Sequence, residues 1–194
     1  MAFLSERELA AIGFARVGRA VRVSDKVSIH GAGAISLGDH ARIDDFCVLS
    51  ASGGGSIEIG RYVHVSPHAI LLGGGTIVLE DFAQLSSRAT LLSASDDIHG
   101  EYPIGAAIPE EFRCIHRGRI VLRRYSGVAA GSTVLPDVEI GEGTIVGAMS
   151  LVRGDCEPYS LYVGVPARRI KARGRGFLRR IEALLEREKE DADR

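Results

Sequence analysis

The chain has 194 residues, which fits one domain of ordinary size, and its 45% hydrophobic and 25% charged content is typical of a globular protein. Its net charge of −1 argues against non-specific nucleic-acid binding, which needs a strong basic excess. The chain holds three cysteines but no CxxC pair, so we expect neither a disulfide framework nor a zinc motif, and we expect Cys47 to be a buried thiol. We find no signal-peptide pattern and no apolar run near the roughly 18 residues of a transmembrane helix. The protein is therefore expected in the cytoplasm, without membrane insertion.

The N-terminus carries the signature of a short helix. Ser5 followed three residues later by Glu8 matches a capping box. This pattern predicts a helix over about residues 6–13 that ends at Gly13. We expect residues 1–16 to be a helical cap on one end of a repetitive fold, because the ends of such folds expose unpaired strand edges.

From Val17 onward, aliphatic residues recur every six positions, and the phase slips by two at Leu37. Three longer repeats, 35–55, 56–75 and 76–95, then overlay on one another. Their large residues align in three sets: Leu37, Ile59 and Leu79; Ile43, Val65 and Leu85; Leu49, Leu71 and Leu91. The glycine triplets at 53–55 and 73–75 match in the overlay, and they indicate either corner turns or a groove floor under a ligand.

The repeat stops at Ser93 and returns near Ile120, which leaves an insertion over residues 93–119. A loop of this length inside a compact fold is unusual and commonly functional. It contains two adjacent carboxylates, Asp96 and Asp97, followed by His99.

After the insertion the period of six is strict. Small or β-branched residues follow the large ones at a spacing of four. Helices repeat at about 3.6 residues and half-buried strands at 2, so this period fits neither. It predicts three short strands per coil around a narrow core, an all-β solenoid over residues 17–156. The large residues are Leu122, Val128, Val134, Ile140, Val146 and Val152.

Beyond residue 156 the chain predicts a return segment and a charged C-terminal helix, together residues 157–194. Apolar residues at helical spacing over 177–190 lie in a heavily charged frame. We expect this helix to be a solvated or self-associating tail.

The period of six and the segment 164–171 (Gly-Val-Pro-Ala-Arg-Arg-Ile-Lys) together resemble the hexapeptide-repeat acyltransferases, over roughly residues 15–173. The similarity is strongest to sugar O- and N-acetyltransferases of the galactoside, maltose and O-antigen type. It implies a left-handed parallel β-helix. The hand comes from the resemblance, since general rules alone favour right-handed crossovers. It also implies acetyl-CoA as acyl donor, a sugar or sugar-nucleotide acceptor, and a homotrimer with sites between subunits.

The resemblance also implies where the coenzyme binds. Ala130 and Ala148 match positions whose backbone groups bond the pantetheine arm. Arg153, Arg168 and Lys171 match positions at the nucleotide end, where cations suit the phosphates. No metal is expected.

A base must take the proton of the acceptor, and His suits this role because it titrates near neutral pH. We expect His99 to be the base and Asp97 to orient it, with Asp96 as an acceptor ligand. The resembling family carries His-Pro-x-His here, and this chain has Asp at the first of those positions. His64 is the rival, as base or as acceptor ligand beside Ser66, and His116 is a third candidate.

The sequence therefore predicts a CoA-dependent sugar O- or N-acetyltransferase, with cell-surface polysaccharide or O-antigen synthesis as its setting. Two alternatives stay open. One is a zinc lyase of the γ-carbonic-anhydrase type, in which His64, His68 and His99 would bind the metal. The other is a non-catalytic β-helix scaffold.

Overall fold

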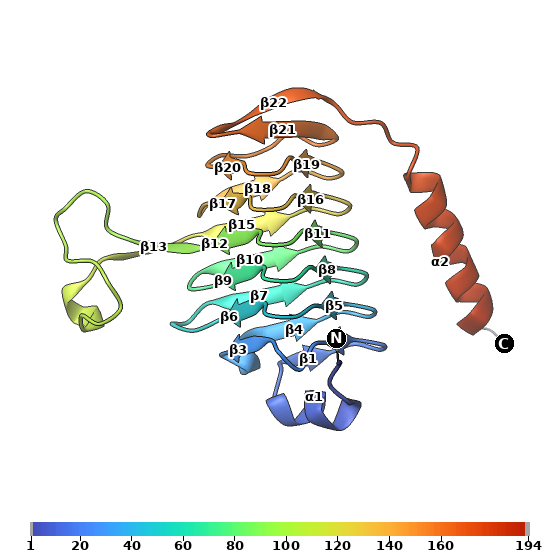
Figure 1. The fold of residues 1–194 in the computed structure, drawn as a ribbon, viewed down its shortest axis with the longest axis horizontal. Helices are drawn as coiled ribbons and strands as arrows, with labels where there is room; N and C mark the ends of the chain where they lie inside the picture. The colour runs from blue at the N-terminus through green and yellow to red at the C-terminus, as the bar shows by residue number, and fades with distance from the viewer. Residues whose placement is uncertain (1, 193–194) are drawn as a thin grey trace.

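The structure, a computed structural model, describes residues 2–192 and is a parallel β-solenoid with a loop projecting from one side and a helix lying beside another (Figure 1). The coils stack along one axis, so each face of the prism is a parallel sheet, apart from one antiparallel strand pair at the upper end of the second face. The predicted fold class is confirmed.

Three sheets form the three faces. The first sheet contains β1 (Arg16–Val17), β4 (Ile35–Leu37), β7 (Ser56–Ile59), β10 (Thr76–Leu79), β15 (Arg119–Leu122) and β18 (Val138–Ile140). The second contains β2 (Arg22–Val23), β5 (Arg42–Ile43), β8 (His64–Val65), β11 (Gln84–Leu85), β16 (Gly127–Val128), β19 (Ile145–Val146), β21 (Ser160–Gly164) and β22 (Ala167–Ala172). The third contains β3 (Ser28–His30), β6 (Val48–Ser50), β9 (Ile70–Leu72), β12 (Thr90–Leu92), β17 (Thr133–Val134) and β20 (Leu151–Val152).

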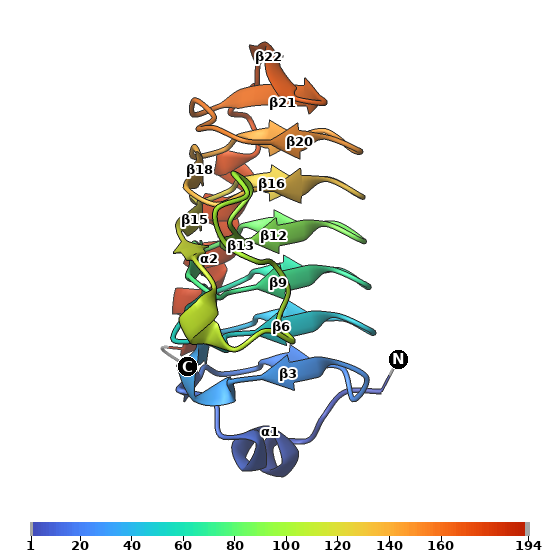
Figure 2. The same cartoon turned by 90° about the vertical axis from the view of Figure 1, so that its left-hand side faces the viewer.

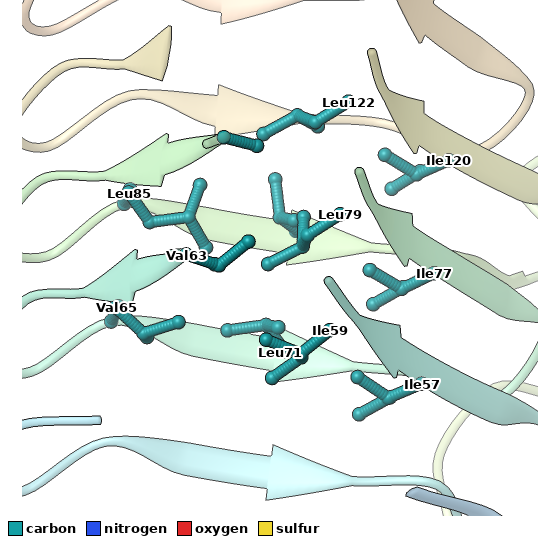
Figure 3. Packing of buried hydrophobic residues seen from close by; sticks show 14 of the residues in the cluster. Ile57, Ile59, Val63, Val65, Leu71, Ile77, Leu79, Leu85, Ile120 and Leu122 are labelled. Atoms are coloured by element: carbon teal, nitrogen blue, oxygen red, sulfur yellow. The ribbon is translucent and has the colours of Figure 1, made fainter. Parts of the chain in front are cut away.

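The core is a column of aliphatic side chains, as the period of six predicts. Val134 is fully buried and pairs in register with Leu91 below and Val152 above. The overlay of the longer repeats is also confirmed, since Ile59 pairs with both Leu37 and Leu79. Figure 3 shows Ile59, Leu79 and Leu122 stacked in one column, beside a second column formed by Ile57, Ile77 and Ile120. Each burial removes apolar surface from water and fixes the register of the next coil.

The third corner joins the third sheet to the first and contains both glycine triplets. Gly53 and Gly54 adopt positive φ angles of 75° and 85°. A Cβ on Gly55 would lie 1.8 Å from the carbonyl oxygen of Gly73, and one on Gly75 would lie 2.1 Å from that of Gly118. Adjacent coils therefore approach too closely for a side chain, which supports the interpretation as corner turns.

The N-terminal cap forms as predicted. Helix α1 (Glu6–Ile12) begins at Ser5, whose hydroxyl accepts from the amide of Glu8 while the Glu8 carboxylate accepts from the Ser5 amide. Gly13 ends the helix in the left-handed conformation, and a short 3-10 turn, η1 (Ala32–Ala34), lies in the next coil. Leu9 is buried against the end of the solenoid, so the helix covers its lowest coil.

The insertion projects from the third corner as an antiparallel pair, β13 (Ala94–Asp96) and β14 (Ile115–Arg117), with a turn, η2 (Glu110–Phe112), near its tip (Figure 2). Several large apolar side chains on it are exposed: Ile98, Tyr102, Ile104 and Phe112. Exposed apolar side chains gathered on one loop indicate a contact surface.

The first corner, between the first and second sheets, carries a column of aromatic rings. His40 stacks on Tyr62, Tyr62 on Phe82, and Phe82 lies beside Tyr125, with centroid distances of 4.6, 5.1 and 5.5 Å. Phe177 completes the column edge-on at 5.8 Å from Tyr125.

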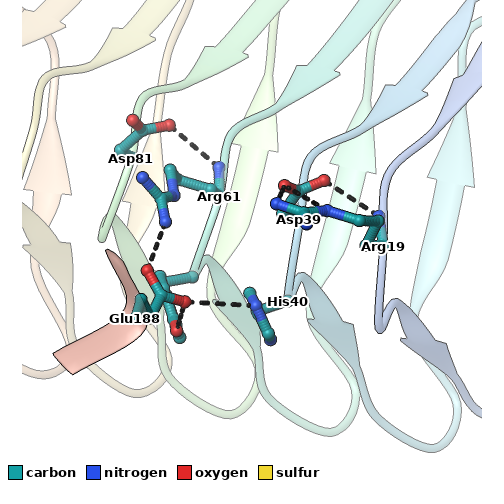
Figure 4. Close-up of polar contacts among 7 residues, drawn as sticks. Arg19, Asp39, His40, Arg61, Asp81 and Glu188 are labelled. Carbon is teal, nitrogen blue, oxygen red and sulfur yellow. Dashed lines mark hydrogen bonds and ion pairs between the residues drawn. The ribbon is translucent and has the colours of Figure 1, made fainter. Parts of the chain in front are cut away.

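Helix α2 (Leu178–Ala192) lies along this first corner, which differs from the expected solvated tail. Glu188 accepts from Arg61 at 2.5 Å, pairs with His40 at 3.2 Å and contacts the hydroxyl of Tyr62 (Figure 4). Burial, together with the bond to Glu188, raises the pKa of Tyr62 to about 12. The sequence pattern identified the helix but not its binding surface. Among residues 2–192, neither helix is long and apolar enough to cross a bilayer.

Candidate functional site

The second corner, between the second and third sheets, carries two of the predicted coenzyme residues, Ala130 and Ala148. Backbone hydrogen bonds link successive coils along this corner. The amide of Met149 donates to the carbonyl of Ala130 at 2.9 Å, and that of Gly131 donates to the carbonyl of Ser87 at 3.1 Å. Ala148 and Ala130 therefore lie one coil apart, with Ser87 in the coil below. Both alanines are exposed, so a ligand can approach the backbone at these two positions.

At this corner the positive-φ position of one coil is a glycine, where neighbouring coils carry His68, Arg88 and Met149. Gly131 has a φ of 69°, and a Cβ there would lie 2.5 Å from the sulfur of Met149. The same ladder continues downward, because the amide of Arg88 donates to Pro67 and that of His68 donates to Asp45. The second corner is thus a continuous backbone ladder from the upper coils to the lower ones, with a small residue (Ala148, Ala130 or Ser87) before the positive-φ residue in each of three coils.

The upper end of the solenoid is cationic. A cavity of about 470 Å³ is lined by Arg153, Arg168 and Arg169, together with Asp155 and Tyr162. The structure thus brings two of the predicted nucleotide-end residues to one cavity. Lys171 lies further along β22, paired with Leu161, and does not line it.

The loop carboxylates are engaged with the loop itself. Asp97 accepts from the backbone amides of His99, Glu101 and Tyr102 at 2.7–2.9 Å, and these bonds lower the pKa of its carboxyl. Asp96 accepts from the amide of Gly105 and from the guanidinium of Arg113. Asp97 therefore contacts the backbone of His99 rather than its imidazole, which is exposed.

His64 lies on the second sheet in contact with a carboxylate that the sequence analysis missed. Its Nε2 is 2.7 Å from Oδ2 of Asp44, and Nε of Arg42 donates to Oδ1 of Asp44, also at 2.7 Å. The Asp44 side chain is only 4% exposed. Burial alone would raise the pKa of Asp44, but the bonds from Arg42 and His64 outweigh it and hold the pKa below its ordinary value.

Ser66 lies two residues after His64, at the start of the second corner, and its carbonyl accepts from the thiol of Cys47. Cys47 is fully buried, as predicted, and burial raises its pKa to about 11.

The other histidines are dispersed. His116 pairs with Asp137 at 2.6 Å, but both side chains are more than half exposed. His68 stacks on Phe46 at the second corner with ring centroids 5.1 Å apart. Within residues 2–192, no group of three His, Cys, Asp or Glu side chains is arranged to hold a metal, including the three histidines of the lyase alternative.

A larger cavity, about 770 Å³, lies on the outer face of the first sheet, where Arg123 bridges Glu80 at 2.8 Å and Glu139 at 2.6 Å. None of the predicted site residues lines it. Salt bridges between residues of neighbouring coils fill this face, and we interpret it as structural.

No family model matches the chain, but comparisons with individual proteins are informative. It is 40% identical to dTDP-4-amino-4,6-dideoxy-D-glucose acyltransferase from Escherichia coli over 178 residues, 92% of each chain. It is 28% identical over 148 residues, 74% of each chain, to a putative lipopolysaccharide biosynthesis O-acetyl transferase, WbbJ, from Escherichia coli K12.

Solved structures of an N-acyltransferase have the same fold as this chain. AntD, an N-acyltransferase from Bacillus cereus in complex with dTDP and 3-hydroxybutyryl-CoA, superposes with a TM-score of 0.90 at 40% identity, over 96% of this chain and 98% of AntD. A serine variant of AntD in complex with dTDP-4-amino-4,6-dideoxyglucose and coenzyme A superposes with a TM-score of 0.89 at 41% identity, over 95% of this chain and 98% of that one.

Proposed function

We propose that this chain, which belongs to the hexapeptide-repeat acyltransferase family, transfers an acyl group from a coenzyme A thioester to a sugar nucleotide. The observation that carries this proposal is the second corner. There Ala130 and Ala148 lie exposed one coil apart, and an arginine-lined cavity lies at the upper end of the solenoid, on a chain whose relatives bind coenzyme A and dTDP-linked sugars.

For the acceptor we propose an amino group of a dTDP-linked 4-amino sugar. The two relatives at about 40% identity act on or bind such compounds according to their names. The similarity to WbbJ supports a setting in cell-surface polysaccharide synthesis. Acyl-CoA and nucleotide sugars are made in the cytoplasm, and we place the reaction there.

For the donor we propose that the pantetheine arm of acetyl-CoA lies along Ala148 and Ala130. Backbone amides and carbonyls there can bond its amide groups. Arg153 and Arg168 would meet the nucleotide end at the upper cavity, with Lys171 further out along β22. Because cations suit phosphates, this polarity puts the thioester at the lower end, near Ser87.

The AntD structures include variants at one serine and one aspartate that are ten residues apart. In this chain Ser86 and Asp96 have that spacing, as do Ser87 and Asp97. This supports a place for the loop carboxylates at the acceptor amine, in addition to their bonds within the loop.

We also propose a homotrimer. The loop carries Ile98, Ile104 and Phe112 with 86, 67 and 61% of their surface exposed, and the second corner exposes Phe46 and Met149. A neighbouring copy that covers the corner with its loop would bury both sets and bring Asp96, Asp97 and His99 to the acceptor. Light scattering at micromolar concentration should give three times the monomer mass, and a monomer would contradict this arrangement.

The function is tested by thiol release from acetyl-CoA against a panel of free sugars, UDP-sugars and dTDP-amino sugars. We expect turnover with dTDP-4-amino-4,6-dideoxyglucose and a product acylated on nitrogen. Absence of both turnover and acetyl-CoA binding would favour the scaffold alternative.

A further inference from the structure

One buried carboxylate interrupts a column of small side chains next to the second corner. In each coil this position directly follows the inward aliphatic residue of the second sheet. Those aliphatic residues pair in register from Val23 to Val146. The residues at the position are, from the lowest coil upward, Ser24, Asp44, Ser66, Ser86, Ala129 and Gly147. The neighbouring coils fold with Ser, Ala or Gly there, so the repeat itself does not require a carboxylate, and its partners set Asp44 apart.

The contacts of Asp44 fix the proton on His64. The carboxylate accepts from Arg42 through one oxygen and meets Nε2 of His64 through the other, each at 2.7 Å. An ionised carboxylate only accepts, so Nε2 carries a proton, and in the neutral ring Nδ1 then presents a lone pair. The His64 side chain is 38% exposed, so the ring reaches the surface of the second sheet.

The place of His64 suits a role at the second corner. It stacks directly below Gln84, and Gln84 below Gly127, on the outer face of the second sheet. Gly127 is three residues before Ala130, and Ser66 follows His64 into the same corner. The imidazole therefore lies on the wall below the proposed thioester position, near the column that leads to Ser86.

The exposed pair His116–Asp137 shows what sets Asp44 apart. Its Nε2–Oδ2 distance is similar, 2.6 Å, but water reaches both partners. The carboxylate of Asp44 is shielded, so its support of a positive imidazolium is screened less by solvent.

We propose that His64 accepts the proton of the acceptor amine, and that Asp44 is the positioning residue that holds its ring and tautomer. The inference rests on the acyl transfer proposed above. In the step, the amine nitrogen attacks the thioester carbonyl, the C–N bond forms and the C–S bond breaks. The amine proton passes to Nδ1 of His64 and then to the departing thiolate, so the products are an amide and free coenzyme A.

The experiment compares steady-state transfer from acetyl-CoA to dTDP-4-amino-4,6-dideoxyglucose in His64→Gln, Asp44→Asn and Asp44→Glu. The matched control is His30→Gln, which changes an exposed histidine of the third sheet. We expect His64→Gln to lower kcat by about 10²–10⁴ with the KM for acetyl-CoA nearly unchanged, and to flatten the rise of kcat with pH. Asp44→Asn should lower kcat less, Asp44→Glu should recover part of it, and the control should match the parent.

A His64→Gln variant that melts like the parent and keeps kcat within about threefold would overturn the proposal, since the loss expected of a base is at least 10². A loss in His99→Ala that exceeds the loss in His64→Gln would overturn it as well and move the base to the loop. If the parent itself turns over no sugar nucleotide, the proposed function and the pair fail together. If the parent is active and His64→Gln keeps its activity, only the role of His64 and Asp44 is refuted, and the proposed acyl transfer stands.

Discussion

The first and second corners have the same backbone geometry but opposite surroundings. Both place non-glycine residues at positive φ in successive coils, for example Tyr62 and Phe82 at the first corner and His68 and Arg88 at the second. At the first corner an aromatic column is covered by α2 and Phe177. At the second, alanines follow one another and Phe46 and Met149 stay exposed, at 52 and 73%.

The difference shows how one repeated coil serves two purposes. Large rings at the first corner give the C-terminal helix a surface on which to pack, so that corner contributes stability. Small residues at the second corner leave backbone groups open, which is what an extended ligand such as pantetheine needs. Corner side chains point away from the core, so they vary without disturbing the aliphatic column.

The largest expected effect tests what both corners share. Val134→Asp puts a carboxylate into a core one side chain wide, where it has no partner, at a cost of several kcal/mol. We expect no soluble folded protein, measured by expression and circular dichroism, and Val134→Ile as control should stay soluble. A soluble Asp variant with the parent's melting temperature would contradict the observed register.

The next prediction distinguishes the role of the second corner from that of the first. Ala130 precedes Gly131 at the second corner as Arg124 precedes Tyr125 at the first, in the same coil. Ala130→Trp should raise the KM for acetyl-CoA by at least about tenfold, because the indole fills the proposed path of the pantetheine arm. Arg124→Trp should leave that KM unchanged. Equal effects in the two variants would move the coenzyme away from the second corner.

A smaller effect is expected for stability against pH at Asp44. Its pKa is lowered in the folded protein, so its contribution is present above the unfolded pKa and is lost as the pH falls through the folded one. We expect Asp44→Asn to lower the free energy of unfolding by about 1–3 kcal/mol at neutral pH. In urea titrations, that difference from the parent should shrink steadily below pH ~4. A difference independent of pH would mean that the carboxylate charge does not stabilise the fold.

The fold was largely predictable because each coil buries its large residues at a fixed interval, so Leu37, Ile59 and Leu79 could be aligned without a structure. The proposed coenzyme positions came from the family resemblance. The pairing of Asp44 with His64 could not be found in this way, because the two residues lie in different coils and neither belongs to the aliphatic repeat. The packing of α2 on the first corner could not be predicted from the sequence either. Its rings, from His40 to Tyr125, are separated by unequal intervals, since coil lengths vary and the loop interrupts them.

At the upper end of the solenoid we expect Arg168→Ala to raise the KM for acetyl-CoA several-fold with a smaller change in kcat, because remote phosphate contacts bind ground and transition states alike. Arg168 lines the upper cavity and Lys171 does not, so Lys171→Ala should have the weaker effect. Initial rates at varied acetyl-CoA, measured for the two single variants and for the double variant, test both expectations. An unchanged KM would place the nucleotide end of the coenzyme elsewhere.

The smallest effect is expected at the first corner, where Glu188 holds α2. It contacts Arg61, Tyr62 and His40 while remaining about one quarter exposed, so water screens these contacts in part. Glu188→Ala should therefore cost only about 1 kcal/mol and lower the melting temperature by about 2–4 °C. Because the covered corner lies away from the proposed track, kcat and the KM for acetyl-CoA should not change. Glu186→Ala, one of the exposed positions of the same helix, is the matched control. A loss of activity in Glu188→Ala without a loss of stability would mean that the two corners are not independent, and that α2 acts on the site through the solenoid.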